Sequence, residues 1–354
     1  MVVEKDIVAI SIPFTAGVAM AAVWPPGGIS PFWIAGGSCV GVSLLLFAYG
    51  RLRPYTGTVL ALFWLLGVFA FNSDSLVFPA GRPAWPPAQR ALAALLRAID
   101  AGGLPHPETG ALLKALLAGQ RGGLDPETVR IFREAGASHL LALSGLHLGL
   151  LYGILQRLLS PLGHSRPAQL LRSAACVGAS LFYLLMTGAA PSLVRAFLFI
   201  CFNELSRLMP GRRRRPLNIF CAALVLQLTL TPDVIRNVGF QLSYLAMLGI
   251  QLVYPVLSSW YPPSSPRDPV RRLWNTLALT LSCQLFTAPL AWLRFGTFPR
   301  CFLLTNLGGL PLTEAFLLTA LPTLLPGCPD GIKNLADFFG QALLSFLGTV
   351  ASIA

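Results

Sequence analysis

Apolar runs of about twenty residues constrain the fold of this chain more than any other feature, because about 20 residues of helix cross a bilayer. Only 11% of the residues are charged, whereas soluble domains carry about 25%. We therefore predict an all-α polytopic integral membrane protein with about ten or eleven transmembrane helices and a small extracytoplasmic helical cap. The predicted spans are residues 7–23, 31–49, 57–71, 137–159, 169–187, 192–209, 217–231, 238–258, 273–293, 301–325 and 335–353.

The basic residues predict the orientation of these spans. The net charge is +12, and arginines gather at alternate connections, after the spans that end near residues 49, 159, 209 and 258. Cytoplasmic loops carry such an excess, so we predict a multi-pass protein of the cytoplasmic (inner) membrane with a cytoplasmic N-terminus. The densest cluster is Arg212, Arg213, Arg214 and Arg215. It is interpreted as a topology signal, the alternative being a guide for an emerging anionic polymer.

One stretch does not fit a membrane span. Residues 72–136 hold many charges and several prolines, but Gln89–Ile99 has helical apolar periodicity. This segment is predicted to lie outside the membrane as a linker with amphipathic helices. These helices either lie on the membrane surface or pack as a cap on the bundle. The predicted division is therefore 1–71 for N-terminal spans, 72–136 for the linker, 137–325 for the main domain and 326–354 for a C-terminal transmembrane or interfacial helix.

The span 137–159 combines polar residues with glycines. On one continuous helix, Gly145, Gly149 and Gly153 share roughly 80° of arc. His139, Ser144 and His147 share roughly 140° on the other side. We expect the glycine side to pack closely against a neighbouring helix and the polar side to face something other than lipid.

An arginine begins the next notable stretch, TGAAPSLVR at 187–195. Gly188 ends one apolar run, and Pro191 suits the first turn of the following helix. Arg195 then lies one turn into a span, where a guanidinium near a helix N-terminus favours anions. The alternative is that Arg195 reaches the outer headgroups.

Polar residues recur at one depth. By topology, five of them lie in the outer half of the bilayer on different helices: His139, Arg195, Gln241, Gln284 and Asn306. Together with Ser243, they predict a shared polar cavity that opens outward, the alternative being separate interhelical hydrogen bonds.

Signatures of catalysis are sparse. The sequence has no HExxH motif and no GxxxxGK[ST] loop, and its seven cysteines form no CxxC pair. Ser144 and His147 resemble part of a Ser/His hydrolase, but they lie one turn apart without an apparent acid. We expect no enzymatic activity, no catalytic residue, no metal and no cofactor.

Four long motifs carry a family resemblance: HLLALSGLHLGLL at 139–151, GAAPSLVRAF at 188–197, LN at 217–218 and GFQLSYLAMLGI at 239–250. They resemble the competence domain of ComEC-type DNA-internalisation proteins, and the resemblance extends over about residues 88–325. It implies a channel that passes single-stranded DNA across the cytoplasmic membrane during natural transformation. The OB-type and metallo-β-lactamase-like domains of many family members are expected to be absent from this sequence.

The resemblance also implies site residues and partners. DNA-path or signature positions are His139, Ser144, His147, Ser192, Arg195, Gln241, Ser243, Gln284 and Asn306, and packing or helix-break positions are Gly145, Gly149, Gly153, Gly188 and Pro191. Bases are expected to stack on Phe240 or Tyr244. Expected partners are single-stranded DNA, membrane lipids, an extracytoplasmic DNA receptor or nuclease, and a cytoplasmic ATP-driven translocase. Two alternatives are a transporter for a small anionic solute or lipid, and a Ser/His membrane hydrolase.

Overall fold

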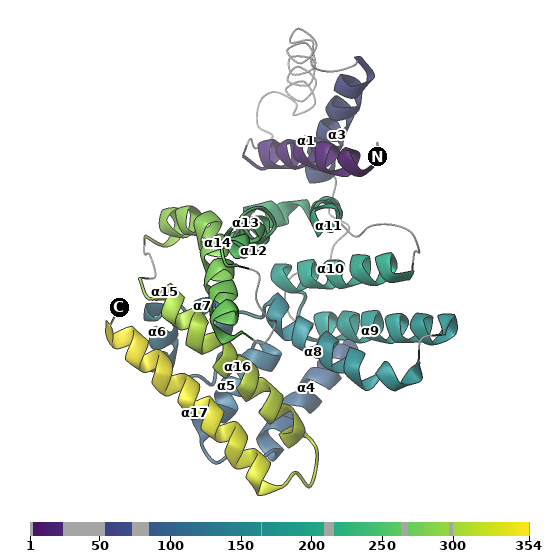
Figure 1. The fold of residues 1–354 in the computed structure, drawn as a ribbon. Coiled ribbons are helices and arrows are strands. Elements are labelled where there is room, and N and C mark those ends of the chain that lie inside the picture. Colours follow the sequence, from purple (N-terminus) through teal and green to yellow (C-terminus); the bar gives the residue numbers. More distant parts are fainter. Residues whose placement is uncertain are drawn as a thin grey trace.

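Helices form all the regular secondary structure that is described (Figure 1). The computed structural model describes residues 3–23, 54–72, 85–163, 165–208, 216–262, 268–296 and 300–353. The α-helices are α1 (Val3–Val23), α3 (Pro54–Asn72), α4 (Pro86–Ala101), α5 (Pro107–Ala118), α6 (Pro126–Glu134), α7 (Ser138–Leu141), α8 (Gly145–Leu158), α9 (Arg166–Met186), α10 (Pro191–Leu208), α11 (Pro216–Leu230), α12 (Val238–Leu252), α13 (Tyr254–Ser259), α14 (Pro269–Phe295), α15 (Phe302–Leu304), α16 (Leu310–Ala320) and α17 (Asp330–Ile353). Short helices of other types are η1 (Ser160–Leu162), η2 (Pro232–Arg236), η3 (Thr305–Gly309) and η4 (Leu321–Leu324).

The prediction of an all-α membrane protein is confirmed, whereas the number of spans is not. Five stretches are long and apolar enough to cross a membrane: Arg166–Met186, Val238–Ser259, Pro269–Phe295, Phe302–Leu324 and Asp330–Ile353. Two shorter apolar helices are Ile7–Val23 and Pro216–Leu230. The predicted span 31–49 and the cluster Arg212–Arg215 lie outside the described residues.

The predicted continuous helix over residues 137–159 is wrong. Helix α7 ends at Leu141, Ala142 is extended, and α8 begins only at Gly145 after an extended Ser144. His139 and His147 therefore belong to different helices, and the two-sided arrangement expected for one helix does not exist.

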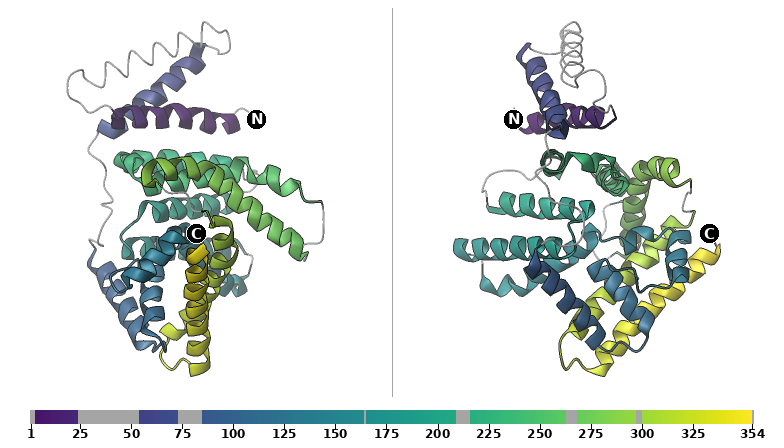
Figure 2. Two further views of the ribbon diagram at one scale, coloured as in Figure 1. Left: turned by 90° about the vertical axis from the view of Figure 1, so that its left-hand side faces the viewer. Right: turned by 180° about the vertical axis from the view of Figure 1, so that it is seen from behind.

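The two ends of the molecule are formed by different helices. Helices α1 and α3 lie together at one end beside α11, and α4, α5, α16 and α17 lie toward the other end (Figures 1 and 2). The first pair packs backbone against backbone, since a Cβ on Gly17 would overlap with the Trp64 carbonyl and one on Gly67 with that of Phe14. Glycine at both positions therefore allows the close crossing.

The α4–α6 segment packs against helices from the C-terminal part of the chain. Helix α5 buries Leu112, Leu113 and Leu116 in the same cluster as Phe316 and Leu343 of α16 and α17. Along α4, apolar side chains pack against two buried clusters, while Arg90 and Arg97 on its other face are exposed. The segment is thus part of the core and not a detached surface helix.

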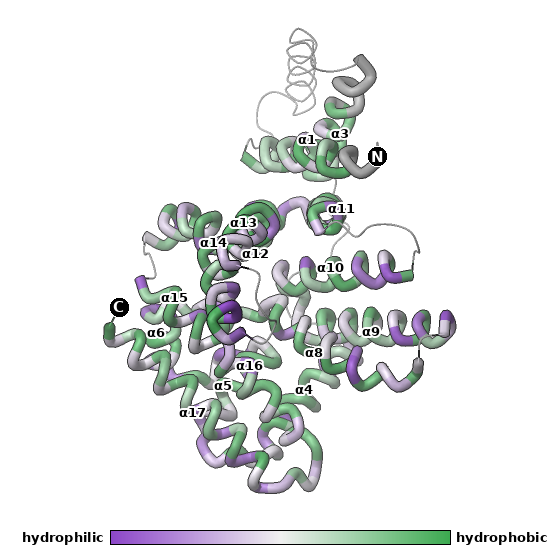
Figure 3. Tube along the Cα trace, viewed as in Figure 1, coloured by the Kyte–Doolittle hydropathy of each residue, from purple (hydrophilic) through white to green (hydrophobic). Residues whose placement is uncertain are grey.

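Hydropathy differs between the middle and the ends of several helices (Figure 3). Long hydrophobic stretches run along α14 and α17, and the hydrophilic start of α9 lies beside the hydrophilic end of α10. These two ends carry Arg166, Arg172 and Arg207. Their proximity agrees with the basic connections that the sequence places on one side of the membrane.

A glycine on α12 allows its close contact with α14. A Cβ built on Gly249 would overlap with the carbonyl oxygen of Ser282. We expect Gly249→Ala to force the two helices apart and to lower the free energy of unfolding by about 1–3 kcal/mol, the usual cost of overpacking. Gly149→Ala is the matched control, because a Cβ there meets nothing within 4 Å. Thermal unfolding in detergent measures both, and equal midpoints for Gly249→Ala and wild type would contradict the described packing.

Candidate functional site

Two breaks in helical structure lie at the centre of the sequence motifs. The first is the extended stretch between α7 and α8. Ser144 caps α8, with its Oγ accepting from the Leu146 amide at 3.2 Å. The His147 Nδ1 in turn accepts from the Ser144 amide at 3.1 Å. This reciprocal pair is a capping box in which histidine takes the place of the usual Glu or Gln.

The second break separates α9 from α10. Gly188 and Ala189 both adopt positive φ, at 84° and 51°, and α10 begins at Pro191. Glycine tolerates this conformation without steric cost, and proline suits the first helical turn because its missing N–H needs no acceptor there. Gly188 and Pro191 thus lie at this helix break.

Backbone carbonyls at the two breaks accept hydrogen bonds from side chains of other helices. The Ser192 hydroxyl donates to the Leu143 carbonyl at 2.7 Å, across the two breaks. The buried Gln227 of α11 donates to the Pro191 carbonyl at 3.1 Å and accepts from the Tyr244 hydroxyl of α12 at 2.9 Å. Buried carbonyls need such partners, so these bonds fix α8, α10, α11 and α12 relative to one another.

Arg195 lies within the same junction. Its guanidinium donates to the Ser243 carbonyl of α12 and lies 5.9 Å from the centre of the Tyr244 ring. A Cβ on Gly145 would come within 3.7 Å of Arg195 Nη2, so α8 begins beside this charge. In the part of the chain that the structure describes, no carboxylate forms an ion pair with Arg195. Among the described residues, the positive charge of the junction therefore has no carboxylate beside it.

The three glycines of α8 do not share one role. A Cβ on Gly145 would meet Ala196 at 3.3 Å, which indicates close packing on α10. At Gly149 and Gly153, a Cβ would meet nothing within 4 Å. The expected close-packing stripe is therefore reduced to Gly145 among the described contacts.

The other predicted polar residues do not all meet Arg195. His139 contacts the Gly136 carbonyl through Nδ1 at 3.1 Å, and the Asn306 side chain lies beside its ring. Gln241 donates to the Ile235 carbonyl at 2.7 Å, one turn before its own helix, and Gln284 is partly exposed on α14. The described contacts therefore form an Arg195 group and a His139–Asn306 group instead of one polar level.

Three buried polar atoms at predicted positions have no hydrogen-bond partner among the residues that the structure describes: His147 Nε2, Gln241 Oε1 and Asn306 Oδ1. Because His147 Nδ1 accepts a hydrogen bond, its proton is on Nε2, which is then a buried donor. Asn306 lies in the π-helical η3, and such segments are frequent at functional sites. Unpartnered buried polar groups are costly, which marks these positions as candidates for a ligand or water.

Ser144 and His147 are arranged as a helix cap. The Ser144 Oγ lies 3.3 Å from His147 Nδ1, but each atom also accepts a backbone hydrogen bond of the capping box. In a serine–histidine hydrolase, an acid orients the second ring nitrogen, whereas His147 Nε2 has no partner among the described residues.

The aromatic residues expected to stack on bases are not available for it. Phe240 and Tyr244 are 4% and 6% exposed and pack in one cluster with Phe220 of α11. Their rings fill the core between α11 and α12, which excludes them as a surface for nucleobases in this conformation.

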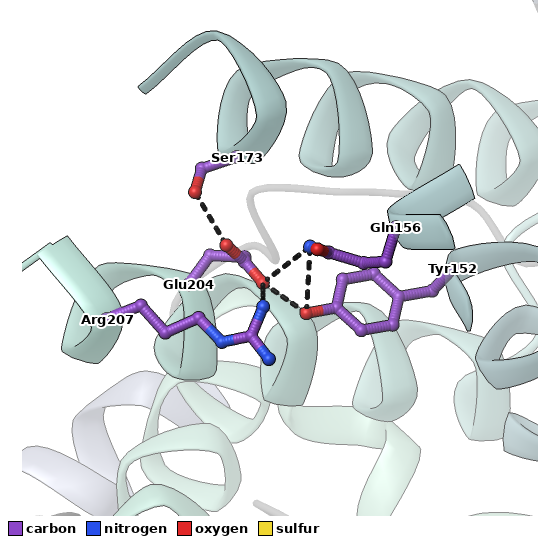
Figure 4. Close-up of polar contacts among 5 residues, drawn as sticks. All are labelled: Tyr152, Gln156, Ser173, Glu204 and Arg207. Carbon is purple, nitrogen blue, oxygen red and sulfur yellow. Dashed lines mark hydrogen bonds and ion pairs between the residues drawn. The ribbon is translucent and has the colours of Figure 1, made fainter. Parts of the chain in front are cut away.

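Sequence reasoning missed a buried carboxylate, Glu204 on α10 (Figure 4). It is 3% exposed and accepts hydrogen bonds from Tyr152, Gln156 at 3.1 Å, Ser173 at 2.6 Å and Arg207 at 3.0 Å. These partners come from α8, α9 and α10. The available signal was an acidic residue within a predicted span, which is a functional candidate by default. Asp337 in the last span was missed for the same reason.

Glu204 provides a test of this packing. Glu204→Ala leaves Arg207 and three polar side chains without their acceptor, so we expect a loss of about 3–5 kcal/mol in the free energy of unfolding. Glu204→Gln retains part of the hydrogen bonding and should lose less. Glu134→Ala is the control, since Glu134 pairs with Arg130 at the exposed surface of α6 at 3.6 Å, where about 0–1 kcal/mol is expected. If unfolding in detergent is unchanged by Glu204→Ala, the cluster does not hold the three helices together.

Comparisons with known proteins place the chain in a family. The family described as "Competence protein" matches residues 116–354. "ComE operon protein 3" of Bacillus subtilis is 28% identical over 254 residues, which cover 70% of this chain and 30% of that protein. "Recombination protein 2" of Haemophilus influenzae is 29% identical over 59% of this chain and 27% of its own length. "Competence protein ComA" of Neisseria gonorrhoeae is 28% identical over 69% of this chain and 34% of its length.

These matches determine the family and its extent here. The chain spans about a third or less of the length of these relatives. No solved structure matches significantly. Since the family match extends over well over half of the sequence, the chain belongs to the Competence protein family.

Proposed function

We propose that this chain is a membrane channel that passes single-stranded DNA across the cytoplasmic membrane during natural transformation. The observation that carries the proposal is Arg195, a partly buried cation without a described carboxylate partner. An isolated charge inside a membrane protein is costly, and a passing phosphate diester supplies the opposite charge. Family membership makes DNA the anion that we infer.

The breaks around Arg195 support a path at this position. Non-helical backbone at membrane depth is tolerated where it is buried in protein or lines a water-filled space. The α8 N-terminus begins beside Arg195, and a helix N-terminus favours anions. The strand would pass the α8–α10 junction without sequence preference, because phosphates carry no sequence information.

The arrangement in the cell follows from the charges. We propose a multi-pass inner-membrane protein with its N-terminus and basic connections in the cytoplasm. An extracytoplasmic receptor or nuclease would deliver the strand, and a cytoplasmic ATP-driven translocase would pull it. A transporter for a small anionic solute or lipid needs the same charge at Arg195, so only a DNA-specific readout separates it from the channel.

Arg195→Ala tests the proposal in a transformable strain that lacks its own copy of the gene. A charge-assisted hydrogen bond contributes about 1.5–3 kcal/mol, so we expect transformation to fall roughly ten- to hundredfold. Surface binding of labelled DNA should persist. Arg195→Lys keeps the charge and should retain more activity. Arg130→Ala on the exposed face of α6 is the control and should transform like wild type.

Protein amount and thermal midpoint must be measured alongside transformation, since Arg195 also binds the Ser243 carbonyl. Wild-type transformation by a stable Arg195→Ala protein would contradict the proposed role. Loss of transport of a small anion, with DNA uptake intact, would favour the transporter.

Ser144→Asn separates the channel from the hydrolase. Asparagine is as good an N-cap as serine, so α8 should remain intact while the hydroxyl nucleophile is removed. We expect near-normal transformation from Ser144→Asn, and a stability loss of about 1 kcal/mol from Ser144→Ala. Abolished transformation in a stably folded Ser144→Asn protein would instead favour the hydrolase.

A further inference from the structure

A cavity lies outside the Arg195 junction, between α4, α5 and the loop that follows α5. Its volume is about 560 Å³, within the range of roughly 300–1,000 Å³ for small-molecule sites. One wall is a single face of α5, formed by Pro107, Gly110, Ala111 and Lys114. The opposite side includes Gly122 and other residues of the loop and of the α4–α5 connection.

Glycines leave this cavity open. A Cβ on Gly110 or on Gly122 would meet nothing within 4 Å, so the backbone there borders empty space. Peptide backbone without side chains offers a flat surface that a planar group can approach closely. The cavity can therefore hold a planar ring system as well as a small ion.

One lysine lines the cavity and a second lies beside its wall, and each is paired with an exposed carboxylate. Lys114 Nζ lies 2.5 Å from Asp100 Oδ1, and the side chains are 27% and 65% exposed. Lys333 Nζ, 3.1 Å from Asp330, lies near Gly103 of the cavity wall, with exposures of 25% and 89%. An ion pair with one exposed partner contributes little to stability. An anionic ligand can therefore displace these carboxylates at little cost.

His106 presents the opposite arrangement, with its carboxylate buried. The Asp337 side chain is 8% exposed and the His106 side chain 60%. Asp337 accepts from His106 Nδ1 at 2.6 Å, from the His106 amide at 3.2 Å and from the Thr109 hydroxyl at 2.6 Å. Because an ionised carboxylate only accepts, the proton is on Nδ1 in the neutral ring. Asp337 thus holds the ring at the cavity wall with Nε2 left for a ligand.

We propose that this cavity binds one nucleotide unit, with its phosphate at Lys114 and Lys333 and its base against the glycine surface. The choice of a nucleotide among phosphate esters rests on the proposed function. The unit is either part of a DNA strand or a free nucleotide. Gln120 and His106 line the same cavity and supply hydrogen-bonding groups for the base or sugar.

The test uses the full chain purified in detergent and a short fluorescein-labelled oligothymidylate, with binding followed by fluorescence anisotropy. Two variants affect the cavity differently: Lys114→Gln/Lys333→Gln removes its cations, and Gly110→Leu fills it without changing charge. We expect both to weaken binding by about tenfold or more, the first because charge-assisted hydrogen bonds are lost and the second because the leucine side chain occupies the space of the ligand. If unlabelled thymidine monophosphate displaces the labelled oligonucleotide, the cavity is a site for free nucleotides. If only an unlabelled oligonucleotide displaces it, the cavity is a site for a DNA strand.

The control removes two charges elsewhere. Arg130→Gln/Arg133→Gln changes the exposed surface of α6. On that surface, the hydrogen bond from Arg130 holds the pKa of the Glu127 carboxyl below its usual range. This control should bind within about twofold of wild type, because diffuse surface charge contributes little at moderate salt. The proposal would be overturned if the control weakened binding as much as the cavity variants do. It would also be overturned if either cavity variant, with an unchanged unfolding midpoint, bound the oligonucleotide with wild-type affinity.

The outcome is independent of transport. Oligonucleotide binding to this cavity requires no passage across a membrane, so it is measured in the purified protein whatever the transport activity is. A strain in which transformation does not depend on the gene would refute the channel, while cavity binding would still be measurable in the purified protein.

Discussion

The hydrogen bond from Ser192 to the Leu143 carbonyl joins two breaks in helical structure, and the surrounding architecture depends on it and on its neighbours. Each break frees backbone groups that lipid cannot satisfy. The Ser192 hydroxyl and the Gln227 amide bind two of the freed carbonyls, and Tyr244 binds Gln227 in turn. The result is a polar junction of α8, α10, α11 and α12, in which every broken segment is held by a side chain from another helix.

The sequence predicted several of the helices but not the interruption before α8. Apolar length located α9, α14 and α17 within a few residues, because helix length reflects bilayer thickness. The break before α8 was missed because the apolar run continues on both sides of Ser144, and a capping box with histidine at its N3 position was not recognised. Glu204 and Asp337 were visible as acids within spans, but their partners lie on other helices. One sequence carries no information about such pairs.

Arg195 illustrates which features of the site can be predicted from the sequence and which cannot. Its position one turn into α10 was predictable from Pro191, and the expectation of a functional intramembrane cation stays a prediction. Its neighbours were not predictable, since the Ser243 carbonyl and the start of α8 reach it only through tertiary packing. The same packing buries Tyr244 beneath the guanidinium, so the aromatic ring supports the cation instead of stacking on a base. The cost of this arrangement is explained if a phosphate passes the junction.

The most direct measurement of that central claim is photo-crosslinking of a strand in transit. A single-stranded DNA that carries photoreactive thymidines would be arrested during uptake, irradiated, and mapped by mass spectrometry on the isolated protein. The account predicts crosslinks to the α8–α10 junction, at residues 143–147 and 192–196. Efficient crosslinking that is confined to other helices, with none at this junction, would contradict it.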